Sequence, residues 1–230
     1  MIKNIVLVHG AWADGSGWEG VHKILTDAGY NVTIVPSPNT SLSDDVKITK
    51  AVLSQQNGPT VLVGHSYGGV VISEAGNHPN VKALVYVAAF VLDVGESLAK
   101  MLQDAPPDPN SPVLPPADGF IWLDRSRFHA NFCADVPVAK AKFMADSQVP
   151  VGLAAFGTDL SAAAWKSKKS WYIVSTEDKM IPPDAERGMA KRANAQVTEI
   201  QSSHAVYISH AREVANVIKK AAEVEVLEHA

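Results

Sequence analysis

Short apolar runs alternate with helical patterns along the first third of the chain. Residues 2–8, 31–35 and 60–63 are rich in Val, Ile and Leu, which is typical of strands buried on both faces of a parallel sheet. Residues 18–30 and 43–56 place apolar side chains at helical spacing. Strands and helices in this order predict a parallel sheet that is covered by helices on both faces.

The alternation continues with a helix predicted over 67–76 and a strand predicted over 81–91, and then it stops. The segment 93–169 is rich in proline and aromatic residues, with helical patterns near 135–148 and 157–165. Because it is too apolar to be a linker, we expect this segment to form a lid over the carboxyl edge of the sheet.

The pattern of strands and helices resumes after the lid. Strands are predicted over 171–175 and 196–200, and helices over 184–193 and 206–222. We therefore predict a single α/β fold whose mostly parallel sheet has about six strands. Its expected parts are a core of residues 1–92 and 170–226, a lid of residues 93–169, and a tail of residues 227–230 of the kind that a cloning vector leaves.

Composition narrows the possible functions. The chain has 24 acidic and 20 basic residues, and the basic residues are scattered, so we expect no binding to nucleic acid. Cys133 is the only cysteine, which excludes an internal disulfide and a metal cluster held by cysteines. No apolar run reaches the roughly 18 residues of a membrane helix. We expect a cytoplasmic monomer or homodimer that acts on a small molecule without a metal or cofactor.

The candidate chemistry centres on Gly64-His65-Ser66-Tyr67-Gly68-Gly69, which lies between a predicted strand and a predicted helix. The glycines let strand and helix approach closely, so that Ser66 stands on a tight turn with its hydroxyl raised above the sheet. Such a serine is a candidate nucleophile. Because G-x-S-x-G also arises by chance, the rest of the chain must supply its partners.

A serine nucleophile needs a base, and the base should lie beyond the carboxyl end of a strand. Of the eight histidines, only His9, His65 and His204 follow predicted core strands. We expect His9 and His65 to support the turns on which they lie. His204 stands alone on the loop after the last strand, and it is the predicted base.

The base in turn needs an acid that orients it. Asp178 follows the strand predicted over 171–175 and precedes two prolines that would keep its loop extended. Glu177 and Asp93 are the alternatives, although Asp93 stands where the lid leaves the sheet. With Asp178 the order along the chain is Ser, Asp, His, which is the order expected for a nucleophile on this kind of turn.

Two backbone N–H groups should stabilise the oxyanion that forms during acyl transfer. One is predicted to be that of Tyr67, and the other that of Ala11 or Trp12 in the loop after the first strand. Gly10 would let this loop pass close to Ser66. Aromatic side chains could line the substrate pocket or form the core of the lid, and the pocket candidates are Trp12, Trp122, Phe128, Phe132 and Phe156.

Two further motifs do not carry their usual function. Residues 15–20 fit G-x-G-x-x-G, but six residues separate them from the strand, and Trp18 and Glu19 would crowd a pyrophosphate. We therefore expect no dinucleotide. Residues 97–100 fit S-x-x-K, but the companion motifs S-D-N and K-T-G do not occur.

With these residues assigned, the sequence resembles the α/β-hydrolase family. His9-Gly10-Ala11-Trp12 resembles its oxyanion loop, and residues 64–69 resemble its nucleophile turn. The residues 131–135 and 175–178 are similar to the lid and the acid loop of the small methylesterase and hydroxynitrile-lyase group and of similar bacterial esterases. The resemblance implies an α/β-hydrolase fold in which the chain starts at what would be the family's third strand.

One departure from this group narrows the expected reaction. The lyases carry a lysine after the catalytic histidine, which helps to bind cyanide, and Ala205 occupies this position here. The resemblance therefore implies a serine esterase that cleaves a small, largely uncharged ester or lactone through an acyl-enzyme. The alternatives are a lyase of the hydroxynitrile type and a non-catalytic receptor for a small ligand.

Overall fold

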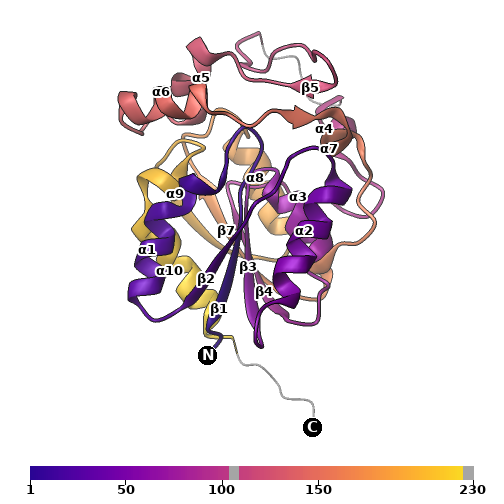
Figure 1. The fold of residues 1–230 in the computed structure, drawn as a ribbon, viewed down its shortest axis with the longest axis vertical. Helices are drawn as coiled ribbons and strands as arrows, with labels where there is room; N and C mark the ends of the chain where they lie inside the picture. Colours follow the sequence, from indigo (N-terminus) through magenta and orange to yellow (C-terminus); the bar gives the residue numbers. More distant parts are fainter. Residues whose placement is uncertain (104–108, 225–230) are drawn as a thin grey trace.

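The computed structural model describes residues 1–103 and 109–224, and its centre is a parallel sheet of six strands (Figure 1). This confirms the predicted sheet. The predicted tail of residues 227–230 lies outside the described residues. In spatial order the strands are β2 (Asn31–Val35), β1 (Asn4–Val8), β3 (Thr60–His65), β4 (Val81–Val87), β7 (Lys169–Ser175) and β8 (Gln196–Ile200).

The burial of the strands explains their composition. Every residue of β1 and β3 is buried, because both strands are central and helices cover both faces. These strands are accordingly almost continuous apolar runs. The outer strands β2 and β8 are partly exposed and contain Asn31, Thr33, Gln196 and Glu199.

Helices cover both faces of the sheet. In Figure 1, α1 and α10 pack together on one face, whereas α2 and α3 pack together on the other. No helix within the described ranges is long and apolar enough to cross a membrane. The helices of the core are α1 (Glu19–Asp27), α2 (Leu42–Ser54), α3 (Gly68–Ala75), α8 (Pro183–Arg192), α9 (Val206–Ser209) and α10 (Ala211–Ala222), and a 3-10 turn at Gly15–Trp18 precedes α1.

The described helices and strands between β4 and β7 lie over the carboxyl edge of the sheet in Figure 1, where the lid was predicted. The helices α4 (Leu98–Gln103), α5 (Arg125–Phe132) and α7 (Leu153–Gly157) were not predicted, and most of 157–165 is not helical. The boundaries at residues 93 and 169 stay predictions. The elements of the lid are α4 (Leu98–Gln103), β5 (Phe120–Ile121), α5 (Arg125–Phe132), α6 (Val138–Asp146), β6 (Val151–Gly152), α7 (Leu153–Gly157) and a 3-10 turn at Ala164–Lys166.

The strand β4 ends at Val87, four residues before the end that the sequence predicts. Ala88 turns the chain with a φ of 43°. The N–H of Phe90 then donates to the carbonyl oxygen of Ser66 at 3.1 Å. The apolar residues after Val87 therefore pack around the serine turn rather than extend the strand.

The packing of α3 against this turn yields a prediction. A Cβ at Gly69 would overlap the carbonyl oxygen of Phe90, whereas a Cβ at Gly188 in α8 would meet no atom within 4 Å. We expect Gly69→Ala to lower the free energy of unfolding by about 1–3 kcal/mol, because the backbone must move. Gly188→Ala should raise it by about 0.5–1 kcal/mol through helix propensity. Urea unfolding followed by circular dichroism measures both, and equal effects would contradict the packing described.

Candidate active site

Ser66 lies where the order of strands reverses. The chain passes from β1 outward to β2 and then returns to β3 on the other side of β1, so that β1 and β3 are neighbours with Val8 opposite Gly64. Loops that leave such a pair of strands frame a crevice at the carboxyl edge of the sheet. Here they carry Ala11 and Ser66.

The turn at Ser66 is strained and tightly packed. Ser66 has a φ of 53°, a conformation that L-residues seldom adopt and that costs of the order of 1 kcal/mol or more. A Cβ at Gly64 would lie 2.5 Å from the carbonyl oxygen of Gly68. A Cβ at Gly10 would lie 2.6 Å from the Cβ of Ser66, which confirms the predicted close approach of this loop. Glycine is therefore required on both sides of the serine.

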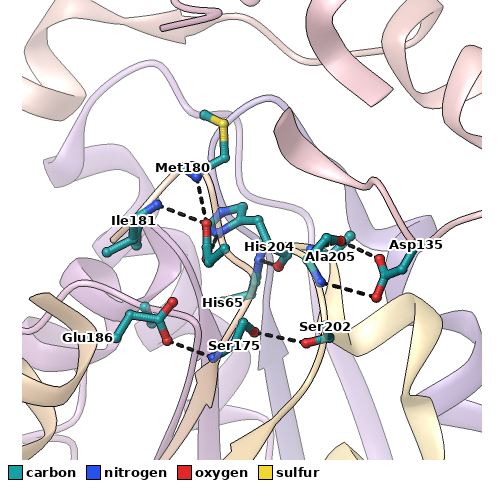
Figure 2. A network of polar contacts seen from close by, with 12 residues as sticks. His65, Asp135, Ser175, Met180, Ile181, Glu186, Ser202, His204 and Ala205 are labelled. Carbon is teal, nitrogen blue, oxygen red and sulfur yellow. Dashed lines mark hydrogen bonds and ion pairs between the residues drawn. The ribbon is translucent and has the colours of Figure 1, made fainter. Parts of the chain in front are cut away.

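His204, which is labelled in Figure 2, and Asp178 form a buried pair at the same edge. Nδ1 of His204 lies 2.5 Å from Oδ2 of Asp178. The other carboxylate oxygen, Oδ1, accepts hydrogen bonds from the N–H groups of Met180 at 2.6 Å and Ile181 at 2.9 Å. With Asp178 as the acceptor, this hydrogen bond holds the proton of the imidazole on Nδ1. Nε2 of His204 is then the ring nitrogen that can accept a proton.

The alternative acids lie elsewhere. Glu177 is exposed, and its Oε1 accepts a hydrogen bond from Gln201. Asp93 forms an ion pair with Lys166 at 2.5 Å where the lid leaves the sheet. Neither carboxylate contacts His204, so the structure brings only Asp178 to the candidate base.

His65 and His9 support the turns, as expected. Burial, together with the nearby His204, lowers the pKa of His65 well below its ordinary value, so its ring is neutral. Its Nε2–H donates to the carbonyl oxygen of His204 at 2.9 Å, and the two rings lie 4.6 Å apart. His9 donates from Nδ1 to the carbonyl oxygen of Gly10 at 3.0 Å. His65 therefore fixes the His204 loop beside the serine turn.

Free backbone donors lie near Ser66. Within the described part of the chain, the N–H groups of Ala11, Trp12 and Tyr67 donate no hydrogen bond. Trp12 has a φ of 57°, and its Nε1–H donates to the carbonyl oxygen of Ile121 in the lid at 3.0 Å. The buried, unpaired donors of the oxyanion loop and the serine turn are suited to bind an oxyanion.

A cavity of about 160 Å³ adjoins Ser66. None of the described residues that line it is charged. These residues are Ala11, Trp12, Ser66, Tyr67, Phe90, Leu98, Leu102, Val113, Ile121, Phe156, Met180 and Ile181.

The cavity corrects part of the predicted pocket. Trp12 and Phe156 line it, whereas Trp122, Phe128 and Phe132 do not. Phe128 stacks on Phe132 with ring centroids 4.8 Å apart, and both are fully buried. The ring of Phe132 also lies 5.0 Å from that of His204. These two phenylalanines therefore form lid core against the imidazole, and Trp122 is half-buried outside the cavity.

Two acidic side chains near the pair were not predicted. Glu186 of α8 is fully buried, and its Oε2 accepts the N–H of Ser175 at 3.0 Å. Burial and the adjacent Asp178 raise the pKa of Glu186 far above its ordinary value, so this carboxyl is neutral near pH 7. Asp135 of the lid accepts the N–H of Ser203 at 3.1 Å, next to His204 (Figure 2). In sequence both look like ordinary surface acids.

No group of three His, Cys, Asp or Glu side chains in residues 1–103 and 109–224 is arranged to hold a metal. Ser97 and Lys100 of the S-x-x-K motif do not form a catalytic pair. Lys100 binds Asp159 at 2.6 Å, and its N–H lies 3.4 Å from the Ser97 hydroxyl in the first turn of α4.

Comparison with known proteins agrees with this geometry. The sequence profile of the Alpha/beta hydrolase family matches residues 5–217. The chain belongs to this family. It has the α/β-hydrolase fold, and its structure superimposes on that of polyneuridine aldehyde esterase with a TM-score of 0.82 at 22% identity, covering 96% of this chain and 99% of the other.

The sequence relatives of this α/β hydrolase include esterases. It is 29% identical to a carbendazim hydrolyzing esterase of Nocardioides sp. over 75% of this chain and 79% of the relative. It is 27% identical to a pyrethroid hydrolase of Sphingobium wenxiniae over 94% of this chain and 86% of the relative. The protein is thus an esterase-like α/β hydrolase.

The neutral carboxyl of Glu186 predicts a pH dependence of stability. The pKa of Glu186 is raised in the folded state, so the unfolded chain loses this proton first as the pH rises above about 4.5. The free energy of unfolding then falls by up to about 1.4 kcal/mol per pH unit. Glu186→Gln removes this effect. Between pH 5.5 and 8.5, the unfolding free energy of the variant should therefore rise relative to that of the wild type in urea titrations.

Glu199→Gln is the matched control. Glu199 is paired with Arg187, which lowers the pKa of its carboxyl. Its contribution to stability is complete above the unfolded pKa and is lost only as the pH falls through the lower folded pKa, so it stays constant over this window. A flat difference between Glu186→Gln and wild type would show that Glu186 is ionised.

Proposed function

We propose that this α/β hydrolase is a serine hydrolase that cleaves small, largely uncharged carboxylic esters or lactones through an acyl-enzyme. Its main support is the buried contact of 2.5 Å between His204 and Asp178, at the sheet edge where Ser66 stands on a strained turn. A pair of this kind prepares one imidazole nitrogen to take a proton from a nucleophile.

In the proposed mechanism the hydroxyl oxygen of Ser66 attacks the carbonyl carbon of the ester. The hydroxyl proton passes to Nε2 of His204, and Asp178 stabilises the imidazolium that results. The N–H groups of Ala11 and Tyr67 donate to the oxyanion of the tetrahedral intermediate. The alcohol then leaves with the proton from His204. Water attacks the acyl-serine with His204 as base, and the acid and the free Ser66 are released.

The cavity supports an apolar substrate. Apart from Ser66, the side chains around it are aliphatic or aromatic, and they include Tyr67 and Trp12. Moving a charged group into such a site costs free energy, because no described lining residue carries a compensating charge. The names of the relatives support the ester class, since one is an esterase and another hydrolyses pyrethroids.

The lyase alternative finds no support in this site. The residue after His204 is the buried Ala205, whose N–H lies 3.3 Å from the hydroxyl of Ser203. A methyl group at this position has no charge with which to stabilise a cyanide leaving group. We therefore propose hydrolysis rather than carbon–carbon cleavage.

Covalent labelling tests the nucleophile. We expect a fluorophosphonate probe to label Ser66 of the wild type, and we expect Ser66→Ala and His204→Ala to abolish labelling and to lower the kcat/KM for p-nitrophenyl butyrate by at least about 1,000-fold. Peptide mapping by mass spectrometry locates the label. Ser97→Ala, in the S-x-x-K motif, should leave labelling unchanged. Folded wild-type protein that takes up no label would disprove the proposal.

Charge discrimination tests the substrate class. p-Nitrophenyl hexanoate and the p-nitrophenyl half-ester of adipic acid have acyl chains of the same length, but only the half-ester ends in a carboxylate, which is too far from the ester to attack it readily. Because this carboxylate would be desolvated in the cavity, the kcat/KM for the half-ester should be at least about tenfold lower than that for the uncharged ester. Rates of hydroxide-catalysed hydrolysis correct for intrinsic reactivity. Equal corrected values would contradict an uncharged substrate.

A further inference from the structure

A buried carboxylate that takes no part in the proposed chemistry contacts the serine turn. Asp45 lies on α2 and is fully buried. Its Oδ2 accepts the hydroxyl of Tyr67 at 2.8 Å. Tyr67 is the residue after Ser66, and its own N–H is one of the free donors described above. A hydrogen bond at the end of the tyrosine side chain therefore restrains the residue that carries this donor.

The other oxygen of the same carboxylate leads to the second donor. Oδ1 of Asp45 accepts the N–H of Asn39 at 2.9 Å. The side chain of Asn39 in turn donates from Nδ2 to the carbonyl oxygen of Gly10 at 3.3 Å. That carbonyl belongs to the peptide unit whose N–H is the N–H of Ala11. One carboxylate is thus connected, through Tyr67 and through Asn39, to both predicted oxyanion donors.

We propose that Asp45 is a positioning residue of the oxyanion hole. One of its carboxylate oxygens fixes Tyr67. The other oxygen fixes Asn39, which in turn binds the peptide between Gly10 and Ala11. This inference rests on the function proposed above, and it concerns how the two donors keep their spacing. Asp45 itself does not touch the substrate.

The backbone conformations of Asn39 and Ser66 explain why these hydrogen bonds are needed. Asn39 and Ser66 both have left-handed conformations, with φ of 58° and 53°. Conformations of this kind persist only where the surrounding contacts impose them. Oxyanion donors must also lie within about 2.7–3.1 Å of the oxyanion, so a small rotation of either loop weakens catalysis. Buried hydrogen bonds to a fixed helix provide the necessary restraint.

The charge of Asp45 matters for both hydrogen bonds. A carboxylate accepts on both oxygens, whereas the amide of asparagine accepts on one side and presents donors on the other. Burial raises the pKa of Asp45 to about 6, and the hydrogen bonds from Tyr67 and Asn39 oppose this rise, while the charge of Asp44 adds to it. At pH 8 the group is ionised. Asp45→Asn therefore breaks one link and leaves the volume of the side chain unchanged.

Steady-state kinetics at pH 8 test the role, with p-nitrophenyl butyrate as substrate and an alkyl trifluoromethyl ketone as inhibitor. The serine oxygen adds to the carbonyl carbon of the ketone and its proton passes to His204, which leaves a hemiketal oxyanion in the oxyanion hole, so the affinity for the ketone reports on the hole. We expect Asp45→Asn and Tyr67→Phe each to lower kcat about 10–100-fold, to weaken ketone binding by a similar factor and to change KM less than about threefold. The double variant should be no worse than the more severe single variant by more than about threefold.

Tyr86→Phe is the matched control. It removes a buried tyrosine hydroxyl that lies 2.9 Å from the hydroxyl of Ser73 in α3 and that makes no direct hydrogen bond to Asp45, Asn39, Gly10 or Tyr67. We expect it to lower the melting temperature and to leave kcat and ketone affinity unchanged. Tyr67→Phe removes only one hydroxyl, so it tests the inference even where Asp45→Asn does not fold.

The outcomes separate the two proposals. Wild-type turnover with unchanged kcat and ketone affinity in Tyr67→Phe would show that the Asp45 contacts are merely structural, and the proposed hydrolase would stand. A loss of kcat in Tyr86→Phe equal to that in Tyr67→Phe would also overturn the positioning role. Folded wild type that turns over no ester and takes up no fluorophosphonate would overturn the proposed function, and the inference with it.

Discussion

The close packing of two loop backbones at the ends of β1 and β3 is the constraint on which the rest of this structure depends. Gly10 lies against the Cβ of Ser66, and Gly64 and Gly68 let the turn close beneath it. This packing puts the serine and the free N–H groups of Ala11 and Tyr67 at one point of the sheet edge. The residues after β4, the acid loop and the His204 loop then assemble around that point, each from the end of a different strand.

Much of this arrangement could be predicted, because a parallel sheet brings the carboxyl ends of its strands to one edge. Residues far apart in the chain, such as Ser66, Asp178 and His204, could be selected by their positions after strands. The six strands followed from apolar runs for the same physical reason, since central strands are buried on both faces. Glycine spacing also predicted the contact between Gly10 and the serine.

The direction in which a side chain points could not be predicted from the sequence. Asp44 and Asp45 are neighbours at the start of α2, and in sequence both suit the helix dipole. Asp44 does bond to Ser41 at the N-terminus, whereas Asp45, about 100° further round the helix, faces the core and binds Tyr67. In the same way, no periodicity distinguishes Phe132, which packs on His204, from the aromatic residues that line the cavity. Contacts between the lid and the sheet decide these directions.

Hydrogen bonds connect the lid to the core at two places. The Trp12 indole and the carbonyl oxygen of Asn39 bind the β5–β6 side, and Asp135 binds the loop of His204. The lid is therefore not an interchangeable module, because replacing it whole would remove partners of the loops around Ser66. Leu98 and Leu102 of α4 also line the cavity, but their side chains are apolar and make none of these hydrogen bonds. Substitutions there would change the shape of the cavity, while the loops that surround the serine would keep their contacts with the lid.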